Sequence, residues 1–398
     1  MLLDRFIRYV KIDTQSDEDS ELSPSTLKQY DLLKLLKKEL DELGIENELD
    51  EYGRLYAHIP GNNSLDAIGL CSHVDTALEC SGKDVNPQVI NNYDLSDIAL
   101  GKSGLVLSKN EYKKLNDLKG KTLITTDGTT LLGADDKAGL AIIMETAENV
   151  LKLPINERHP MSILFTPDEE IGRGPEHFDA KKFGCKFAYT IDGASPLEIS
   201  YENFNAKAAK IEVIGRSIHP GSAKGIMINA SLVLAEFINA LPKDEIPAKT
   251  EGKQGFNHLC YISGSVEKAE ADYIIRNHSK EIIDRQVQDF KNVKSKLEKE
   301  YPGVVINLTF KDQYQNMYEV IKKHPECLDH IKNVFDRLDL SLVSSPTRGG
   351  TDGATFSYLG VPTPNLGTGS YNHHGRFEFA VLEEMELMVK IATEIYKK

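Results

Sequence analysis

The 398-residue sequence contains no tryptophan, only five cysteines and no long uninterrupted apolar run. The cysteines are odd in number and show no paired spacing, so we expect no disulfide framework and a reducing compartment. No apolar segment reaches the length that a membrane-crossing helix requires. The first residues interleave charges with apolar positions and lack the continuous apolar core of a signal peptide. These absences together predict a cytoplasmic protein.

Basic residues are also scarce, because 47 lysines and arginines face 61 acidic residues and leave a net charge of −14. Binding to nucleic acid phosphates requires a basic surface, so we expect no nucleic-acid partner. The same balance disfavours binding to an anionic membrane surface. A surplus of carboxylates suits metal cations, although it is equally typical of an ordinary soluble protein.

Short apolar runs alternate with helical periodicity in the first half of the chain. Helices are predicted over residues 25–43 and 136–151 from the spacing of their apolar positions. Strands are predicted at residues 45–49, 55–59, 67–71, 122–126, 162–165 and 187–191. This alternation predicts an α/β domain with a mixed, mostly parallel sheet flanked by helices. Several of the strands end at polar clusters, which is where open α/β sheets bind their ligands.

The pattern changes after about residue 205, where the order of predicted elements becomes β-α-β-β-α-β. That order is typical of a ferredoxin-like α+β domain. The α/β pattern then resumes with a predicted helix over residues 318–338 and a last helix from residue 382. We therefore predict a discontinuous α/β domain, residues 1–205 and 315–398, interrupted by an inserted domain of residues 206–314.

The first candidate site residues are His73 and Asp75, directly after an apolar strand. Residues two apart in an extended segment point to the same side, so Asp75 could accept the imidazole N–H of His73. A carboxylate in that position is the usual partner of a metal-binding histidine. The triplet by itself is also compatible with a polar surface turn.

Carboxylates gather at two further points. Asp135 and Asp136 directly precede a predicted helix, where they could either bind metal or serve as an acidic first turn. Asp168, Glu169 and Glu170 follow an apolar strand, and three adjacent carboxylates repel one another unless cations neutralise them. One of them could bind metal while its neighbour stays free as a base.

Two weaker signals complete the set. Asp192 follows another apolar strand, and the adjacent histidines His373 and His374 lie near the end of the chain. Imidazole nitrogens combined with carboxylate oxygens suit zinc, cobalt or manganese. Spacing alone does not establish that these residues meet at one point.

Seven segments make the sequence resemble the peptidase T family, the tripeptide aminopeptidases among the co-catalytic metallopeptidases that also include aminoacylases and carboxypeptidase G. The resemblance covers almost the whole chain in the family's order. The segment between Asp75 and Asp135, with VNPQVINNYDLSDIALG, resembles peptidase T more than its cousins. The seven segments are SHVDT, LITTDGTTLLGADDKAG, FTPDEEIGRG, DGASPLEISYENFNA, HPGSAKGIMINA, TRGGTDGATFSYLG and PNLGTGSYNHHGRFE.

The resemblance implies two divalent metal ions per subunit, with zinc expected and cobalt or manganese also suitable. His73 and Asp192 would hold one ion and Glu170 and His374 the other, while Asp135 would bridge both. Asp75 would orient His73, and Glu169 would act as general base toward a metal-bridging water. Asp136, Asp168 and His373 would stay outside the ligand set, although His373 stands where the family commonly has an aromatic residue and remains a competing ligand.

Three residues of the second half are further candidates by resemblance. His219 would stabilise the oxyanion, from the same subunit or from a partner, and the alternative is a plain turn histidine. Arg276 and Arg348 would bind the terminal carboxylate of the peptide, because guanidinium pairs with it bidentately, or would be structural arginines. The inserted domain would act as a lid and would carry the contacts of a homodimer.

The resemblance therefore implies a metallo-aminopeptidase that hydrolyses the N-terminal peptide bond of short peptides, chiefly tripeptides, in peptide catabolism. Two alternatives remain open. The same chemistry could serve a dipeptidase, a carboxypeptidase or an N-acyl-amino-acid deacylase. The chain could also be an inactive metal-binding homologue, which the presence of Glu169 disfavours.

Overall fold

The structure is a computed structural model that describes residues 2–398. The chain divides into two compact units, which are described separately. Unit 1 comprises residues 1–201, 317–345 and 351–398, and unit 2 comprises residues 202–316 and 346–350. The sequence-based boundaries assign residues 202–205, 315–316 and 346–350 to the α/β domain, whereas these short segments cluster with the inserted unit.

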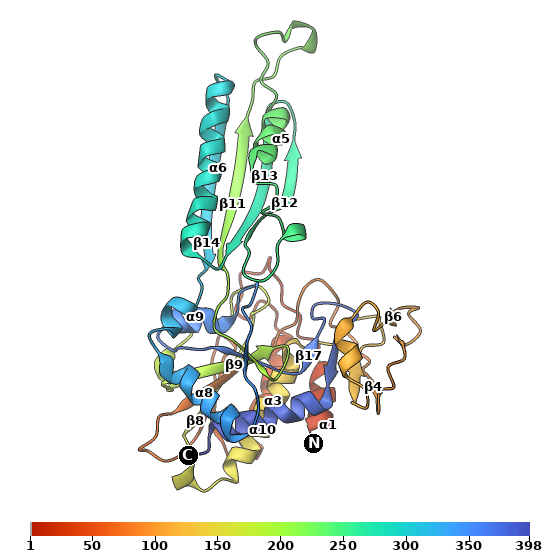
Figure 1. The fold of residues 1–398 in the computed structure, drawn as a ribbon, viewed down its shortest axis with the longest axis vertical. Coiled ribbons are helices and arrows are strands. Elements are labelled where there is room, and N and C mark those ends of the chain that lie inside the picture. Colours follow the sequence, from red (N-terminus) through yellow and green to blue (C-terminus); the bar gives the residue numbers. More distant parts are fainter. Residues whose placement is uncertain (1) are drawn as a thin grey trace. The chain divides into compact units, whose positions relative to one another are not determined.

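The centre of unit 1 is an eight-stranded sheet (Figure 1). Its middle strands β8 (Met161–Thr166), β3 (Ile68–His73), β9 (Phe187–Gly193) and β16 (Asn365–Gly367) run parallel to one another. All residues of β3 and β8 are buried. Parallel strands covered on both faces read as continuous apolar runs, which is why the sequence signals them clearly. The mixed, mostly parallel sheet that the sequence predicts is confirmed.

The remaining strands of this sheet lie at its two edges. On one side β2 (Leu55–Ile59) and β1 (Glu46–Leu49) add antiparallel pairs next to β8. On the other side β10 (Glu198–Ser200) pairs antiparallel with β16 and parallel with β15 (Val343–Ser344).

Alternate residues of the central strands face opposite layers of helices. Leu70 and Ile163 belong to the main apolar core, while their neighbours Cys71 and Leu164 belong to a smaller cluster on the other face. Helix α3 (Ala134–Leu151) packs on β3 and β9 and contacts both α1 (Leu2–Val10) and α10 (Leu382–Ile395). Further helices of unit 1 are α2 (Gln29–Glu42), α4 (Ala180–Phe183), α7 (Tyr318–Ile321), α8 (Pro325–Arg337) and α9 (Asp352–Tyr358).

Two expectations for unit 1 are wrong in detail. The predicted helix over residues 318–338 is two helices, α7 and α8, because Pro325 has no N–H and occupies the first turn of a new helix. The predicted strand at residues 122–126 is β7 (Leu123–Thr125), and it lies outside the main sheet. It belongs to a separate four-stranded sheet with β4 (Gln88–Ile90), β17 (Ser370–Tyr371) and β18 (Phe379–Val381).

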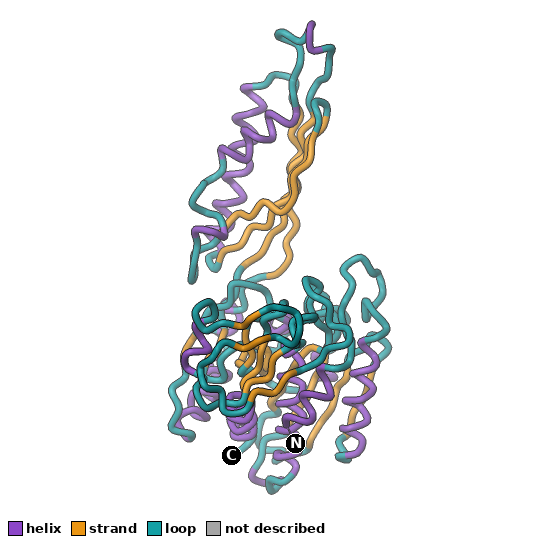
Figure 2. Tube along the Cα trace, turned by 90° about the vertical axis from the view of Figure 1, so that its right-hand side faces the viewer, coloured by secondary structure: helices purple, strands orange, loops and turns teal. Residues whose placement is uncertain are grey.

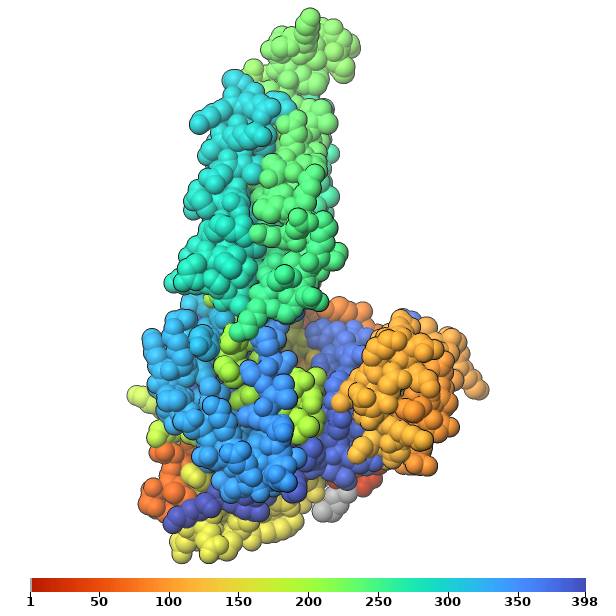
Figure 3. Space-filling view, viewed as in Figure 1, coloured from red at the N-terminus to blue at the C-terminus, as the bar shows by residue number. Residues whose placement is uncertain are grey.

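That smaller sheet builds a side lobe of unit 1, and the part of this lobe that precedes α3 in the chain, with β4 and β7, is the orange region in Figure 3. The lobe also contains the hairpin of β5 (Ile98–Ala99) and β6 (Val106–Leu107). Its own apolar cluster includes Leu100, Leu115 and Phe379. Because Phe379 lies just beyond the two adjacent histidines, the lobe anchors the loop that carries them.

Unit 2 is a four-stranded antiparallel sheet with two helices on one face (Figure 2). The spatial order is β12-β13-β11-β14. Over a shared core, α5 packs against β13 and β11, and α6 packs against β13 and β14. The chain order is β11 (Asn205–Ile214), α5 (Ala230–Ala240), β12 (Phe256–Gly264), β13 (Lys268–Asn277), α6 (Lys280–Glu300) and β14 (Val305–Tyr314). This confirms the predicted ferredoxin-like arrangement. Within residues 2–398, no helix combines the length and apolar character needed to span a bilayer.

Candidate metal centre

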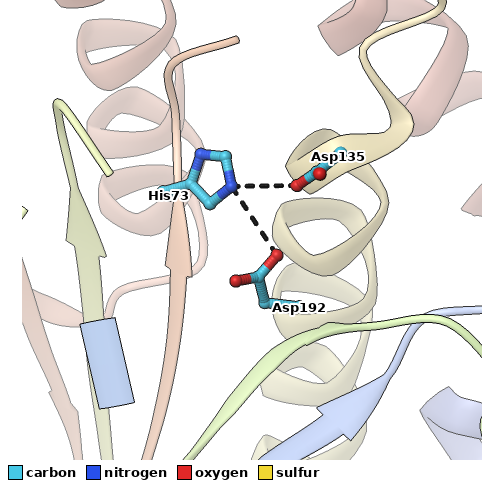
Figure 4. A group of neighbouring side chains, drawn as sticks. All are labelled: His73, Asp135 and Asp192. Carbon is cyan, nitrogen blue, oxygen red and sulfur yellow. Dashed lines mark hydrogen bonds and ion pairs between the residues drawn. The ribbon is translucent and has the colours of Figure 1, made fainter. Parts of the chain in front are cut away.

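Two strand ends and one helix start bring the first group of candidate ligands together in unit 1. His73 is the last residue of β3, Asp192 lies near the end of β9, and Asp135 lies at the start of α3. His73 Nε2 is 3.0 Å from an oxygen of Asp135 and 3.6 Å from an oxygen of Asp192 (Figure 4). Three potential metal donors therefore face one point.

A second group uses the other oxygen of the same aspartate. His374 Nε2 lies 3.3 Å from Asp135 Oδ2 and 3.1 Å from Glu170 Oε2. The two groups, His73–Asp135–Asp192 and Asp135–Glu170–His374, thus share Asp135. They consist of the five residues that the resemblance assigns as ligands, and their role as ligands stays a prediction.

The close approach of α3 to β9 explains how Asp135 and Asp192 meet. A Cβ atom on Gly139, one turn into α3, would lie 2.1 Å from the carbonyl oxygen of Ile191. Only glycine allows the helix to approach the strand end so closely. The helix then presents its first residues to the end of β9.

Burial gives the groups unusual acid–base properties. Burial alone would lower the pKa of His73, but hydrogen bonds to Asp135, Asp192 and Asp75 raise that pKa well above its ordinary value. Hydrogen bonds to Asp135 and Glu170 raise the pKa of His374 to about 12. Burial and the charge of Asp135 raise the pKa of Glu170 to about 7. Metal binding releases protons from the ligands. A proton shared within these donor groups therefore occupies the place that a metal cation would take.

Asp75 supports both His73 and the acidic turn. Its carboxylate lies 3.2 Å from His73 Nδ1. The same carboxylate accepts the backbone N–H groups of Glu169 at 3.0 Å and Glu170 at 3.1 Å. One fully buried side chain therefore orients the histidine and also holds the turn that carries Glu169 and Glu170.

Glu169 lies in this acidic environment without a hydrogen bond of its own side chain to any of the five candidate ligands. Burial, reinforced by the charges of Asp192, Asp352 and Glu170 and opposed by that of His73, raises the pKa of Glu169 well above its ordinary value. A raised pKa makes a carboxylate a stronger proton acceptor. Its role as a base stays a prediction.

Asp168 points away from the candidate ligands and fastens the acidic turn from the other side. Its carboxylate accepts from the Ser25 backbone N–H at 2.7 Å, the Ser25 hydroxyl at 2.5 Å and the Gln29 amide at 2.6 Å. Its backbone has a positive φ of 59°, which non-glycine residues rarely adopt. The three acceptor contacts stabilise that conformation and direct the next two carboxylates inward.

The adjacent histidines make different contacts. His373 Nδ1 is 3.4 Å from Asp135 Oδ2, but its Nε2 is 2.9 Å from the hydroxyl of Ser370. His374 contacts both Asp135 and Glu170. These contacts favour His374 over His373 as a donor of the second group.

Two glutamates near the groups are absent from the sequence-based set. Glu79 Oε1 lies 3.3 Å from His374 Nδ1, the ring nitrogen that faces away from Asp135. The carboxylate of Glu378 accepts backbone N–H groups around Asp135. Glu79 could have been selected from the sequence as a further carboxylate close to His73 and Asp75. Glu378 could not, because its partners are main-chain amides.

The remaining candidate residues belong to unit 2. His219 is exposed, and its ring accepts the backbone N–H of Gly221 at 3.1 Å. Arg276 donates to the carbonyl oxygens of Lys207 and Ile275. Their proposed roles stay predictions.

The guanidinium of Arg348 makes more hydrogen bonds within unit 2 than that of Arg276. It donates to the carbonyl oxygens of Gly252 and Gln254 at 2.8 Å and to both oxygens of Thr250. It also lies over the rings of two phenylalanines. These contacts favour the structural alternative for Arg348 over binding of a substrate carboxylate.

The known proteins whose sequences are similar to this chain are peptidases. A sequence model of the peptidase family M20/M25/M40 matches residues 126–398. Peptidase T of Clostridium perfringens is 46% identical over 99% of this chain and 98% of its own length. Peptidase T of Macrococcus caseolyticus is 46% identical over 100% of this chain and 98% of its own length.

Solved structures share the fold. The aminopeptidase PepT of Bacillus cereus superimposes with a TM-score of 0.77 at 21% identity, over 99% of this chain and 96% of its own. A dinuclear metal-binding peptidase of the M20 family from Bacillus subtilis superimposes with a TM-score of 0.66 at 13% identity, over the same shares. Together with the sequence similarities, these findings show that the chain is a metallopeptidase that belongs to the M20/M25/M40 family and, within it, to the peptidase T family.

Proposed function

We propose that this enzyme removes the N-terminal residue from short peptides, chiefly tripeptides, with two divalent metal ions held by His73, Asp135, Glu170, Asp192 and His374. The observation that carries the proposal is the pair of donor groups that share Asp135. The solved structures with the same fold support this proposal, since one is an aminopeptidase and another is a tripeptidase from Staphylococcus aureus.

The donor groups fit divalent cations on structural grounds. Glu170 Oε1 is buried and has no hydrogen-bond partner, which is costly unless a ligand compensates it. Two imidazole nitrogens and three carboxylates suit zinc, and cobalt and manganese accept the same donors. We name zinc as the expected ion.

The chain's own residues would carry out the proton transfers. Bound divalent ions would polarise the scissile carbonyl and lower the pKa of an attacking water. Glu169 would take the proton of that water and return it to the leaving amine, and Asp75 would keep the turn of Glu169 fixed through its two backbone N–H contacts. His219 would donate to the oxyanion, a contribution of about 2.7–4 kcal/mol for one such donor.

A substrate series tests the proposal. We expect a free tripeptide to be cleaved to its N-terminal amino acid and a dipeptide. Its N-acetylated form should not be cleaved, because an aminopeptidase requires the free amine. If Arg276 binds the terminal carboxylate, a C-terminal amide and a longer peptide should be cleaved more slowly, with product analysis by mass spectrometry as the measurement.

The outcomes of this series separate the alternatives. Cleavage of only the acetylated compound would indicate a deacylase, and release of the C-terminal residue would indicate a carboxypeptidase. Equal rates for the free tripeptide, its amide and the longer peptide would contradict the role of Arg276.

Location and assembly are part of the same proposal. We place the enzyme in the cytoplasm, in peptide catabolism, because its five cysteines are free thiols, as expected in a reducing compartment. We also propose a homodimer through unit 2. Its edge strand β12 exposes Tyr261 and Ile262, and exposed apolar residues on an edge strand favour pairing with a second copy. A purely monomeric mass at micromolar concentration in analytical ultracentrifugation would contradict the dimer.

A further inference from the structure

Glu378 is a buried carboxylate whose three side-chain hydrogen bonds go to the first residues of α3 and to the loop directly before it. It is 1% exposed and directly precedes β18. Its oxygens accept the backbone N–H groups of Leu132 at 2.8 Å, Gly133 at 2.7 Å and Asp135 at 2.9 Å. Hydrogen bonds from amides to an ionised carboxylate are stronger than those between neutral groups.

The loop forms a receptor for this carboxylate. Gly133 adopts a left-handed conformation with φ of 77°, directly before the first residue of α3. Backbone N–H groups in such turns converge and form a small anion-binding concavity. Glu378 fills that concavity with a charge from a different part of the chain.

The pairing of β7 with β18 ends where Glu378 begins. The last paired residues at that end are Thr125 and Phe379. Beyond this point the segment after β7 continues to Asp135, and the segment before β18 leads back from Glu378 to His374. Glu378 is therefore the next connection between the two segments after the sheet hydrogen bonds stop.

The two connected segments carry two donors of the same candidate group. His374 precedes Glu378 by four residues, and its Nε2 lies 3.3 Å from Asp135 Oδ2. The bond from the Asp135 N–H to Glu378 fixes the main chain of one donor against the loop of the other. We propose that Glu378 is a positioning residue, which sets the separation of Asp135 and His374 and so prepares the Asp135–Glu170–His374 group for its metal ion. This inference rests on the metal site of the proposed function.

The test compares metal affinity in Glu378→Gln with that in a matched control. An amide presents only one acceptor oxygen and places an NH₂ group against main-chain N–H donors, so it should not hold the loop. Glu383→Gln is the control, because Glu383 accepts the backbone N–H of Thr122 at 2.9 and 3.0 Å at the other end of the β7–β18 pair. Both variants lose carboxylate–backbone bonds, but only one of them adjoins the candidate ligands.

The main readout is the affinity for Zn²⁺, measured by calorimetric titration of the metal-free full-length protein. For Glu378→Gln we expect the ion of the Asp135–Glu170–His374 group to bind about 10–100-fold more weakly than in the wild type. A loss of this size is typical when a partner that orients a ligand is removed. Excess metal should restore kcat, with KM unchanged. Glu383→Gln should bind both ions as the wild type does, even if its thermal unfolding temperature falls.

Each result has a distinct meaning. Wild-type affinity for both ions in Glu378→Gln would overturn the positioning role, whatever happens to its stability. Failure of the wild type itself to bind two ions would instead contradict the proposed metal site. If Glu378→Gln does not fold, Glu378→Asp keeps the charge but shortens the side chain by one methylene, and unchanged affinity for both ions in that variant would equally overturn the inference.

Discussion

Replacing Glu169 with glutamine is expected to lower kcat for tripeptide hydrolysis by about 10²–10⁴-fold, the usual contribution of a general base. Glu169 is held beside the donor groups by the contact of its backbone N–H with Asp75, and its side chain is not needed to complete either group. The amide cannot accept the proton of the attacking water. The variant should therefore bind both metal ions as the wild type does while it loses activity.

The neighbouring glutamate provides the contrast. Glu170→Gln removes a member of the second donor group, so we expect it to bind fewer metal ions, in addition to losing activity. Glu176→Gln, at a half-exposed residue whose carboxylate pairs with Arg173, should keep both properties. Full peptide hydrolysis by Glu169→Gln, measured at saturating substrate and metal, would overturn the proposed mechanism.

Replacing Asp135 with asparagine is expected to have the second large effect, because both donor groups depend on it. Its two oxygens face different histidines, His73 at 3.0 Å and His374 at 3.3 Å. An asparagine offers one neutral oxygen in place of two charged ones. We expect metal affinity to fall by more than the ~10–100-fold that loss of an orienting partner costs, and the loss should affect both ions.

Asp136→Asn is the matched control for Asp135→Asn. Asp136 is also buried, but its carboxylate belongs to neither donor group. It accepts from the Ser72 hydroxyl and from the backbone N–H groups of Gly139 and His73, the last at 3.4 Å. An amide oxygen still accepts a hydrogen bond, so this variant should keep two bound ions. Metal counting by inductively coupled plasma mass spectrometry checks both variants. Two tightly bound ions in Asp135→Asn would contradict the sharing of that residue.

The main sheet was predictable from sequence because its central strands are buried on both faces. Continuous apolar runs at β3, β8 and β9 each end at a polar residue, and parallel strands bring those ends to one edge. His73 and the acidic turn could be selected on that basis. The residues of β7 carry the same local pattern, yet they pair in the side lobe, because a short apolar run does not specify its partner strand.

Local sequence could not separate adjacent residues of the same type. Asp135 and Asp136 differ only in which way each side chain points from the start of α3, and the resemblance to known enzymes was needed to choose between them. The same holds for Glu169 and Glu170, whose difference arises from the turn that Asp75 and Asp168 hold. Glu378 escaped sequence reasoning because it binds main-chain amides, which every residue except proline possesses.

The most direct test of the central claim is product analysis on a defined free tripeptide with native, chelator-treated and metal-restored enzyme. We predict release of the N-terminal amino acid and the C-terminal dipeptide by the native enzyme, loss of both products after chelation, and recovery when zinc, cobalt or manganese is returned. Unchanged tripeptide cleavage by enzyme shown to be free of bound metal would contradict the account.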